Sequence, residues 1–412
     1  MMWRPEASNS VARELNLVAS RFLLSVLIVN AFTTTTSSTE FGTQTPRDNA
    51  EAYIDENDMA VESPSQTNED SFSGRLLQTN YPSNFAIPVY GFLWNPVAFI
   101  VFLTNSLICI VLLKKHMRTA TNVLLVAIAI SDMLTGLFPV PVFIYFFATD
   151  RFWEFVPYEG CYAVEYLIAI LPTVFHTASI WLTLGLGIQR YISVCHPFKA
   201  RRLCTMKKTV QGILVTFTLA ILSHLCRFFQ EKTLRVERPS AVTPNKTVTS
   251  CNRVWADWAT WNDDLYFNIY FWYRALMIQL IPCTTLSILT VLLIRSLRHA
   301  EKRRVELLQR NRERQSRLLS ESASTTLMLV IVVCLFLLVE MPVGFFVSAM
   351  VVSNQYGYHI VDREILPIVS VFSNFLIILS YPLNLVVYCA MSKKFRDTFK
   401  RLFTRDTSPT AD

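Results

Sequence analysis

Seven apolar stretches constrain the fold of this chain more than any other feature of its sequence. A helix that crosses the hydrocarbon core of a bilayer needs about 20 mostly apolar residues. The stretches that reach this length run over 88–114, 120–147, 162–189, 207–229, 265–294, 324–353 and 365–391. Lipid offers no hydrogen-bond partner to an exposed peptide group, so each stretch is expected to be helical. The sequence therefore predicts an all-α membrane protein in which residues 87–391 form a seven-transmembrane helix bundle.

The distribution of basic residues predicts the orientation of this bundle. The C-terminal tail and the loops on the same face of the bundle hold 24 Lys and Arg residues. The loops on the opposite face hold 7. Basic loops stay in the cytoplasm, which predicts an N-terminus outside, a cytoplasmic tail over 392–412 and a multi-pass protein of the plasma membrane. The net charge of +7 then belongs to the face that lies against anionic lipid, and it indicates no nucleic-acid partner.

The first 86 residues differ from the rest and are expected to form an extracellular N-terminal segment. Residues 40–70 hold nine acidic residues and one basic residue, with few large apolar side chains. Such a stretch cannot bury enough surface to fold, which predicts a disordered acidic tail. Residues 22–32 form an apolar run that follows two arginines, as in a signal peptide. The sequence is equally compatible with cleavage of this signal peptide near residues 31–36 and with an N-terminus that is not cleaved.

Two of the nine cysteines are expected to form a disulfide. The other seven lie in the predicted spans or near the inner face, where thiols stay reduced. Cys161 at the start of the third span and Cys251 in the second outer loop face outward, and a pair in an oxidising compartment predicts a bridge. The same loop holds Asn245 in an Asn-Lys-Thr sequence, which is a glycosylation acceptor.

Several motifs resemble those of the rhodopsin-like G-protein-coupled receptors, in the same order, over about 88–403. They are Asn105, the stretch 121–132, Gln189-Arg190-Tyr191, Pro282, Pro342, and Asn384 with Tyr388. Further stretches resemble the invertebrate sex-peptide and myoinhibitory-peptide receptors, and the myosuppressin and FMRFamide-like receptors share part of the pattern. These stretches are 176–184, 189–196, 227–229, 325–329, 340–342 and 381–384.

The resemblance implies a neuropeptide-activated receptor. Its ligand would be an amidated peptide of the myoinhibitory type or, as the alternative, of the myosuppressin/FMRFamide type. The implied partners are this extracellular peptide, a heterotrimeric G protein of the inhibitory class, arrestin and the lipid bilayer. No cofactor is implied beyond a sodium ion.

The sequence departs from the family pattern at several places, and three of them concern the candidate site residues. Gln189 stands where the family has an Asp, so Arg190 has no adjacent carboxylate. Leu385 occupies the usual Pro position of the last helix, and Pro382 three residues earlier is expected to move the kink. Glu340 stands where the family has a Trp that moves on activation.

Glu340 and Arg274 are the most unusual charged residues of the predicted spans. The resemblance places both in the outer half of the bundle, where they either neutralise each other or recognise polar groups of a peptide. His176 shares a helix face with Arg190 and either lines the floor of that cavity or is a core histidine. The other ligand-binding candidates are Trp255 and Trp258, in a lid or an interfacial belt with Trp261, and Asn374.

Asp132 lies in the middle of a span, where a bare carboxylate needs partners or a cation. Ser179 lies eleven residues before Arg190, three turns along one helix face. The resemblance places Asn105, Asp132, Ser179 and Asn384 together around water and a sodium ion. An interhelix hydrogen-bond cluster without an ion is an equal alternative. No other metal site is predicted.

The cytoplasmic end of the predicted bundle carries the residues that are expected to couple the protein to its transducer. Arg190 is either an interfacial anchor or the group that meets the transducer, and the motif favours the second role. Residues 295–317 hold eight Arg and one Lys interleaved with leucines, which predicts helices that extend into the cytosol. Residues 393–403 place their large apolar side chains on one face, as in a short interfacial helix. The coupling and activation candidates are Gln189, Arg190, Tyr191, Phe336, Pro342, Asn384 and Tyr388.

The sequence gives less support to other classes of protein, such as enzymes, transporters and ion conductors. The chain has no phosphate-binding loop and no hydrolase or zinc-protease motif, so it is not expected to be an enzyme. The matched broken helices of a transporter are also missing from the pattern. An ion- or proton-conducting membrane protein is the alternative from another class, because Asp132 and Glu340 place carboxylates within spans.

Overall fold

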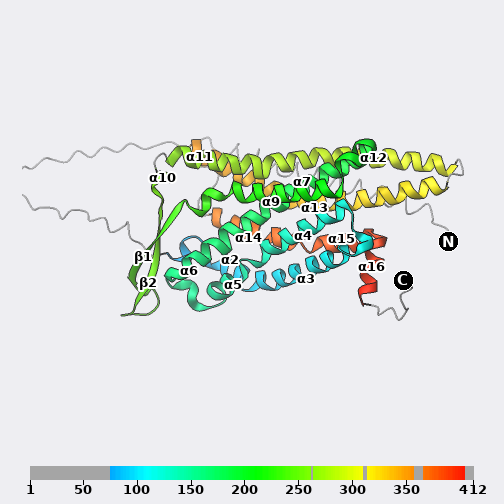
Figure 1. The fold of residues 1–412 in the computed structure, drawn as a ribbon. Helices are drawn as coiled ribbons and strands as arrows, with labels where there is room; N and C mark the ends of the chain where they lie inside the picture. Colours follow the sequence, from blue (N-terminus) through cyan, green and yellow to red (C-terminus); the bar gives the residue numbers. More distant parts are fainter. Residues whose placement is uncertain (1–74, 261–262, 310–312, 357–364, 404–412) are drawn as a thin grey trace, which may run out of the picture. The chain divides into compact units, whose positions relative to one another are not determined.

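The computed structural model describes residues 75–260, 263–309, 313–356 and 365–403. Figure 1 shows these residues as long helices that run side by side, with a β-hairpin at one end. We name this the hairpin end, and the opposite end, where α16 (Lys393–Phe403) lies, the tail end. The signal peptide and acidic tail predicted before residue 75, and Trp261, lie outside the described residues.

The long helices follow one another in chain order, and several consist of consecutive pieces. The first joins α2 (Ser83–Ala86), a π-helical stretch (Ile87–Leu93) and α3 (Trp94–Leu112). The second joins α4 (Ala120–Leu137), α5 (Val140–Val142) and a π-helical stretch (Phe143–Phe147). The third joins α6 (Tyr158–Ala163), a π-helical stretch (Val164–Ile170) and α7 (Leu171–Cys195).

The fourth to seventh helices complete the series, and two of them, the fifth and the sixth, reach further past the tail end. The fourth is α9 (Met206–Ser223), which follows the short α8 (Pro197–Leu203). The fifth joins α11 (Asp263–Tyr273), a π-helical stretch (Arg274–Leu280) and α12 (Ile281–Gln309), and the sixth is α13 (Glu313–Tyr356). The seventh joins α14 (Ile365–Ser380) and α15 (Leu383–Met391). In Figure 1, α12 and α13 run past the other helices, which confirms the predicted helical extensions.

Within the described residues, six helices are long and apolar enough to cross a membrane. The fourth, α9, is not among them, because Lys207 and Lys208 in its first turn lower its mean hydropathy. Its helical part ends at Ser223, earlier than the predicted stretch 207–229, and a 3-10 turn (Leu225–Phe228) follows.

Local sequence signals explain several helix boundaries. The Thr119 hydroxyl accepts a hydrogen bond from the Asn122 backbone N–H and caps α4, and Thr205 caps α9 in the same way through Lys208. The seventh helix is interrupted between Ser380 and Leu383, directly at Pro382. This position agrees with the predicted shift of the kink, because a proline ring cannot continue the helical hydrogen-bond ladder.

The β-hairpin is the part of the fold that the all-α prediction did not anticipate. Strands β1 (Glu231–Pro239) and β2 (Thr247–Trp255) pair antiparallel, with Arg235 opposite Cys251. Isolated bridges join Pro157 to Ser250 and Leu76 to Phe155. The first bridge ties the hairpin to the loop before the third helix, and the second ties that loop to the segment that precedes the first helix.

An aromatic cluster packs the first two helices together near the hairpin end. Tyr90 stacks on Phe143 with ring centroids 4.4 Å apart, and Trp94 meets the same ring edge-on at 5.2 Å. Gly91 allows this approach, because a Cβ atom there would lie 2.6 Å from the Phe147 carbonyl oxygen. The π-helical stretches of both helices meet at this contact.

Candidate functional site

Glu340 on α13 is the centre of a buried hydrogen-bond network that joins four helices. The residue is 2% exposed. His176 Nε2 on α7 lies 3.3 Å from Glu340 Oε1, and Gln279 Nε2 on the fifth helix donates to Glu340 Oε2 at 2.7 Å. His176 Nδ1 also lies 3.2 Å from the Tyr381 hydroxyl of the seventh helix. These donors offset the cost of burying the carboxylate, which is several kcal/mol for an unpaired charge.

Gly344 makes room for the Gln279 side chain in this network. A Cβ atom on Gly344 would lie 2.7 Å from Gln279 Cγ. The Gln279 amide can thus reach both the Glu340 side chain and the Glu340 carbonyl oxygen, the latter at 3.0 Å. The glycine one turn after Glu340 therefore shapes the site without touching the carboxylate.

Asp132 is the centre of a second buried cluster nearer the tail end. It is 2% exposed, and the Ser179 hydroxyl donates to its Oδ1 at 2.6 Å. Asn384 Nδ2 donates to Oδ2 at 3.5 Å. The structure therefore brings together three of the four residues predicted for the sodium or water site.

Asn105, the fourth predicted member, makes a different contact. Its Nδ2 donates to the Val101 carbonyl oxygen of its own helix at 3.0 Å. Its Oδ1 is buried and has no hydrogen-bond partner in the described part of the chain. A buried amide oxygen and a carboxylate are both oxygen ligands that suit a hard cation such as sodium. The residues present therefore fit the predicted ion.

The two clusters are linked through two helices. His176 and Ser179 are three residues apart on α7, and Tyr381 and Asn384 have the same spacing on the seventh helix. On α7 this spacing is one helical turn. In the interrupted seventh helix the Asn384 backbone N–H donates to the Tyr381 carbonyl oxygen at 3.3 Å, which keeps these two residues close as well. A displacement of either helix would therefore change the geometry at both Glu340 and Asp132.

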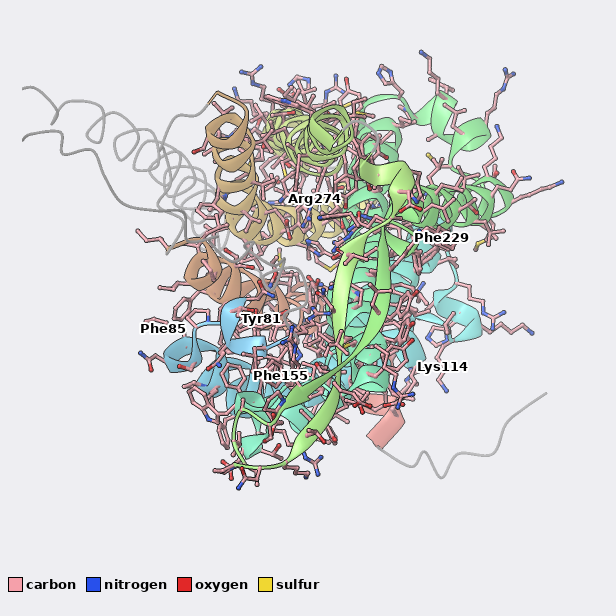
Figure 2. All side chains as sticks on the ribbon, turned by 90° about the vertical axis from the view of Figure 1, so that its left-hand side faces the viewer. Tyr81, Phe85, Lys114, Phe155, Phe229 and Arg274 are labelled. Atoms are coloured by element: carbon pink, nitrogen blue, oxygen red, sulfur yellow. A yellow bond between two sulfur atoms is a disulfide. The ribbon has the colours of Figure 1, made fainter. Side chains whose placement is uncertain are left out.

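Arg274 does not pair with Glu340. Both residues are described, and no ion pair joins them; His176 and Gln279 take that place. Arg274 starts the π-helical stretch and lies five residues before Gln279, roughly 7 Å along a helix axis. In Figure 2, which faces the hairpin end, Arg274 lies beside the upper part of the hairpin.

Trp258 and Asn374, two of the other predicted ligand contacts, bond to residues outside the Glu340 network. Trp258 Nε1 donates to the Phe229 carbonyl oxygen at 3.2 Å, and Trp258 packs edge-on against Tyr266. Trp255 ends β2 and is 42% exposed. Asn374 Nδ2 donates to the Tyr90 hydroxyl at 3.3 Å. Both tryptophans are therefore accessible at the surface, as either a ligand lid or an interfacial belt requires.

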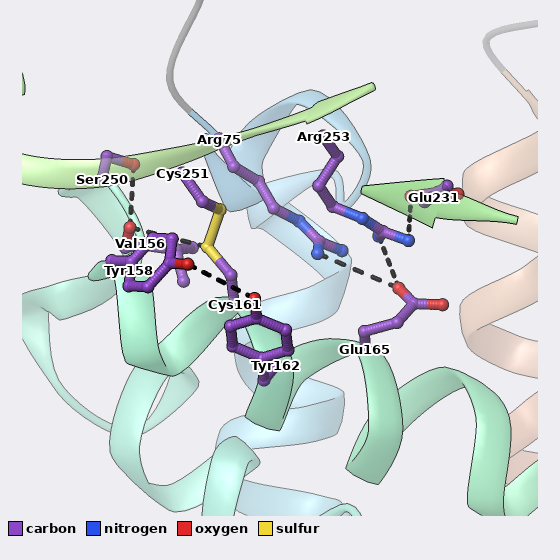
Figure 3. Close-up of a disulfide and its surroundings, with 10 residues drawn as sticks. All are labelled: Arg75, Val156, Tyr158, Cys161, Tyr162, Glu165, Glu231, Ser250, Cys251 and Arg253. Atoms are coloured by element: carbon purple, nitrogen blue, oxygen red, sulfur yellow. Dashed lines mark hydrogen bonds and ion pairs between the residues drawn. A yellow bond between two sulfur atoms is a disulfide. The ribbon is translucent and has the colours of Figure 1, made fainter. Parts of the chain in front are cut away.

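The predicted disulfide between Cys161 and Cys251 is present. It joins α6 to β2, and Figure 3 shows it beside the bridge between the strand and the loop before α6. The Ser250 hydroxyl donates to the Val156 carbonyl oxygen at 2.8 Å. The hairpin is thus fixed to the third helix by both covalent and hydrogen bonds.

A charge cluster lies on the other side of this disulfide. Glu165 on the third helix faces three arginines: Arg75 at 3.9 Å, Arg227 at 3.6 Å, and Arg253 of β2, which also pairs with Glu231. Figure 3 shows the contacts of Glu165 with Arg75 and Arg253. Burial, and next the nearby Arg253, lowers the pKa of Arg75 below its usual value. The Glu165 cluster connects the N-terminal segment, the hairpin and the end of the fourth helix.

The hairpin turn is held by a separate carboxylate. Glu154 accepts hydrogen bonds from the Ser240 hydroxyl and from the Ala241 backbone N–H, the latter at 2.9 Å. Partial burial alone would raise the pKa of Glu154, but these hydrogen bonds lower it below its usual value. Asn245, the predicted glycosylation acceptor, lies exposed in this turn with φ of 64°, a conformation that asparagine tolerates.

Arg190 lies at the tail end of α7. Its Nε is buried and makes no hydrogen bond in the described part of the chain. Its neighbours have clear partners: Gln189 Nε2 donates to the Thr209 hydroxyl at 3.3 Å, and Tyr191 meets His196 edge-on. Tyr388 is buried and packs against Phe395 of α16. The guanidinium of Arg190 therefore has no fixed carboxylate among the described residues.

Two further candidates for activation lie on α13. Pro342 is inside this continuous helix, two residues after Glu340. Phe336 lies four residues before Glu340, which is one helical turn closer to the tail end, and its side chain is half-buried. A change at Glu340 would therefore act on a helix that carries both residues.

Comparisons with known proteins agree with this geometry. The family described as "Serpentine type 7TM GPCR chemoreceptor Srw" matches residues 94–406. The chain belongs to the seven-transmembrane G-protein-coupled receptors. This receptor is 36% identical to the sex peptide receptor of Drosophila melanogaster over 83% of its own length and 79% of that protein. It is 34% identical to sex peptide receptor-related protein 2 of Caenorhabditis elegans, over 80% and 74% of the two chains.

A more distant relative is the FMRFamide receptor of Drosophila melanogaster, which is 28% identical over 76% of this chain and 54% of that protein. These relatives place the receptor among the rhodopsin-like receptors, close to the sex-peptide receptor family. It is a multi-pass protein of the plasma membrane and not an enzyme.

Sequence reasoning missed two parts of the receptor's site. Gln279 was not considered, although a primary amide within an apolar span is itself a sign of a buried hydrogen bond. Glu165 was also overlooked, and it is an acidic residue within the predicted third span. Its partners come from three separate segments, so only the folded chain could reveal them.

Proposed function

We propose that this receptor is activated by an amidated neuropeptide of the myoinhibitory type and that the Glu340 network senses the peptide. The observation that carries the proposal is the buried carboxylate of Glu340, which is held by donors from two other helices and linked through His176 to a third. A group that bonds to this carboxylate can change how four helices pack. The relatives named for sex peptide and FMRFamide support a neuropeptide ligand.

The peptide enters from the hairpin end, which lies outside the cell. The disulfide and the exposed Asn245 acceptor support this orientation, since both modifications belong to an oxidising, extracytoplasmic compartment. The amide end of the peptide donates to Glu340 Oε2 in place of Gln279. Arg274, near the hairpin, is positioned to meet a polar group of the same peptide.

Activation is a shift in the population of helix positions. The peptide must bind the active arrangement more tightly than the resting one. His176 and Tyr381 pass the change toward Ser179, Asn384 and Asp132. Asp132 and Asn105 are the residues that would hold a sodium ion or water, whose charge or hydrogen bonds would stabilise the resting arrangement. The tail end then admits a G protein of the inhibitory class, which contacts Arg190 and the basic parts of α12 and α13. Arrestin binds the same face, and α16 lies along the inner surface of the bilayer.

One experiment tests the ligand and the transducer together. Cells that express the receptor are treated with amidated Trp-ended and Phe-ended peptides, and nucleotide exchange on inhibitory G proteins is measured. A response to Trp-ended peptides supports the proposal, and a response confined to Phe-ended peptides favours the FMRFamide-type alternative. No exchange with either series, together with currents through purified receptor in liposomes, would replace it with an ion-conducting function.

A further inference from the structure

A groove lies between α7 and α9 in the half of the bundle nearer the tail end. Its cavity volume is about 220 Å³. The side chains that line it include Trp181, Leu182, Ile188, Ile192, Ile213 and Thr216. Ile188 is 41% exposed, so the groove opens on the lateral surface of the bundle, where lipid surrounds a membrane protein.

Two glycines create the space in this groove. Gly185 of α7 and Gly212 of α9 both line it, and a Cβ atom built on either would meet nothing within 4 Å. The protein itself therefore does not fill the space that these glycines leave. An apolar chain that entered from the membrane would be in contact with both helices.

The tail-end rim of the groove is polar and basic. Lys208 lines it and donates one of its three hydrogens to the Arg202 carbonyl oxygen at 2.8 Å. Lys207 and Arg201 are exposed beside it. Gln189 also lines the groove; it is 8% exposed, and its buried Oε1 has no partner in the described part of the chain. The rim thus combines positive charge with an unused hydrogen-bond acceptor.

We propose that this groove binds one anionic phospholipid, with an acyl chain across Gly185 and Gly212 and the phosphate at Lys208. The apolar floor suits the chain, and the basic rim suits the phosphate. A headgroup hydroxyl can donate to Gln189 Oε1. With the orientation proposed above, this rim faces the cytoplasmic leaflet, which is the leaflet that holds anionic lipid.

Trp181 makes the site measurable, because it lines the groove about 12 Å along the helix from Gln189. The purified full-length receptor is placed in nanodiscs of phosphatidylcholine with a small fraction of phosphatidylglycerol brominated in mid-chain, and quenching of tryptophan fluorescence is measured. Brominated phosphatidylcholine at the same fraction is the reference lipid. The anionic lipid is expected to quench Trp181 at lower mole fractions than the reference lipid does. Each basic side chain that contacts the phosphate should lower the mole fraction needed for half of the quenching by roughly fivefold.

Matched variants separate the groove from general attraction to the surface. Trp181→Phe should remove the excess quenching, Gly212→Leu should abolish it by filling the groove, and Lys208→Gln should reduce it. Gly212→Ala, which leaves most of the space, and Lys199→Gln, an exposed lysine outside the lining, should retain it. Equal quenching by the two lipids, or full quenching in Lys208→Gln, would overturn the proposal. The assay needs no peptide, so its failure is independent of the proposed ligand.

Discussion

His176 and Glu340 face each other across the third and sixth helices, with Nε2 3.3 Å from Oε1. The contact is an ion pair when His176 is protonated and a hydrogen bond when it is neutral, and in both states the imidazole N–H donates. The same ring reaches Tyr381 through Nδ1. This single side chain therefore couples the least expected carboxylate of the receptor to the interruption of the seventh helix.

Glu340→Gln should lower peptide potency by roughly tenfold, which corresponds to about 1.4 kcal/mol. The change keeps the shape of the side chain but removes the charge that the peptide amide and His176 recognise. Concentration–response curves at matched surface expression measure it. The exchange Arg274→Glu with Glu340→Arg should not restore activity, because no ion pair joins these described residues. Normal potency in Glu340→Gln would remove this residue from ligand recognition.

Gly344→Val should impair the receptor by displacing Gln279. The added Cβ would lie 2.7 Å from Gln279 Cγ, so the Gln279 amide would lose its place against Glu340. Ligand binding and basal G-protein activity should change in the same direction as in Gln279→Ala. Gly185→Ala is the control, since a Cβ there meets nothing within 4 Å. Identical behaviour of the Gly344 and Gly185 variants would show that the close approach is unimportant.

Cys251→Ser should reduce both surface expression and peptide response. The bridge to Cys161 closes a sequence separation of 90 residues, and loss of a native disulfide typically costs about 2–5 kcal/mol. Cys226→Ser, which alters an exposed free thiol at the same end, should behave as the native receptor. Mass spectrometry that finds Cys161 and Cys251 as free thiols in active receptor would contradict the role given to the bridge.

Arg190→Ala should abolish G-protein activation and leave peptide binding detectable. The guanidinium lies at the tail end, far along α7 from His176, and has no carboxylate partner in the described residues. Radioligand binding and nucleotide exchange, measured on the same membranes, separate the two functions. Arg201→Ala, an exposed change on α8, is the control. Full signalling in Arg190→Ala would show that the transducer uses other contacts.

Glu154 should make the order of the hairpin turn depend on pH. Its folded pKa lies below the usual value, so its contribution is fully present above the usual glutamate pKa and is lost as pH falls through the folded value. At neutral pH, Glu154→Gln should speed amide hydrogen exchange over 240–243. Glu159→Gln, an exposed neighbour on α6, should not. Unchanged exchange in both variants would mean that the turn is ordered by other contacts.

Much of the receptor could be predicted because the relevant signals are local or were carried by motifs. The position of the seventh-helix interruption follows from Pro382 alone. Cys161 and Cys251 could be paired because the sequence predicted the other seven cysteines to lie in spans or near the inner face. Asp132, Ser179 and Asn384 meet as predicted. Asn105 does not bond to Asp132 in the structure, because its amide nitrogen is used within its own helix.

The partner of Glu340 shows where such prediction stops. Opposite charge made Arg274 one of the two partners considered for Glu340, beside the peptide, and the structure places His176 and Gln279 there. A π-helical stretch runs from Arg274 to Leu280, and its wider turns change which side chains face the bundle axis. Gln279 also needs the space above Gly344. Neither condition can be read from charge or spacing.

The sequence by itself determined that this chain is a membrane-embedded helical protein, because apolar length and the asymmetry of basic residues act locally and need no knowledge of packing. Its motifs added the resemblance to the receptors. Only the tertiary structure decided which polar groups meet inside the bundle and how the hairpin is held over one end. The four members of the Glu340 network include residues as far apart in the sequence as His176 and Tyr381. Helix rotation and axial offset bring them within hydrogen-bond distance, and both depend on side-chain packing along the whole length of each helix.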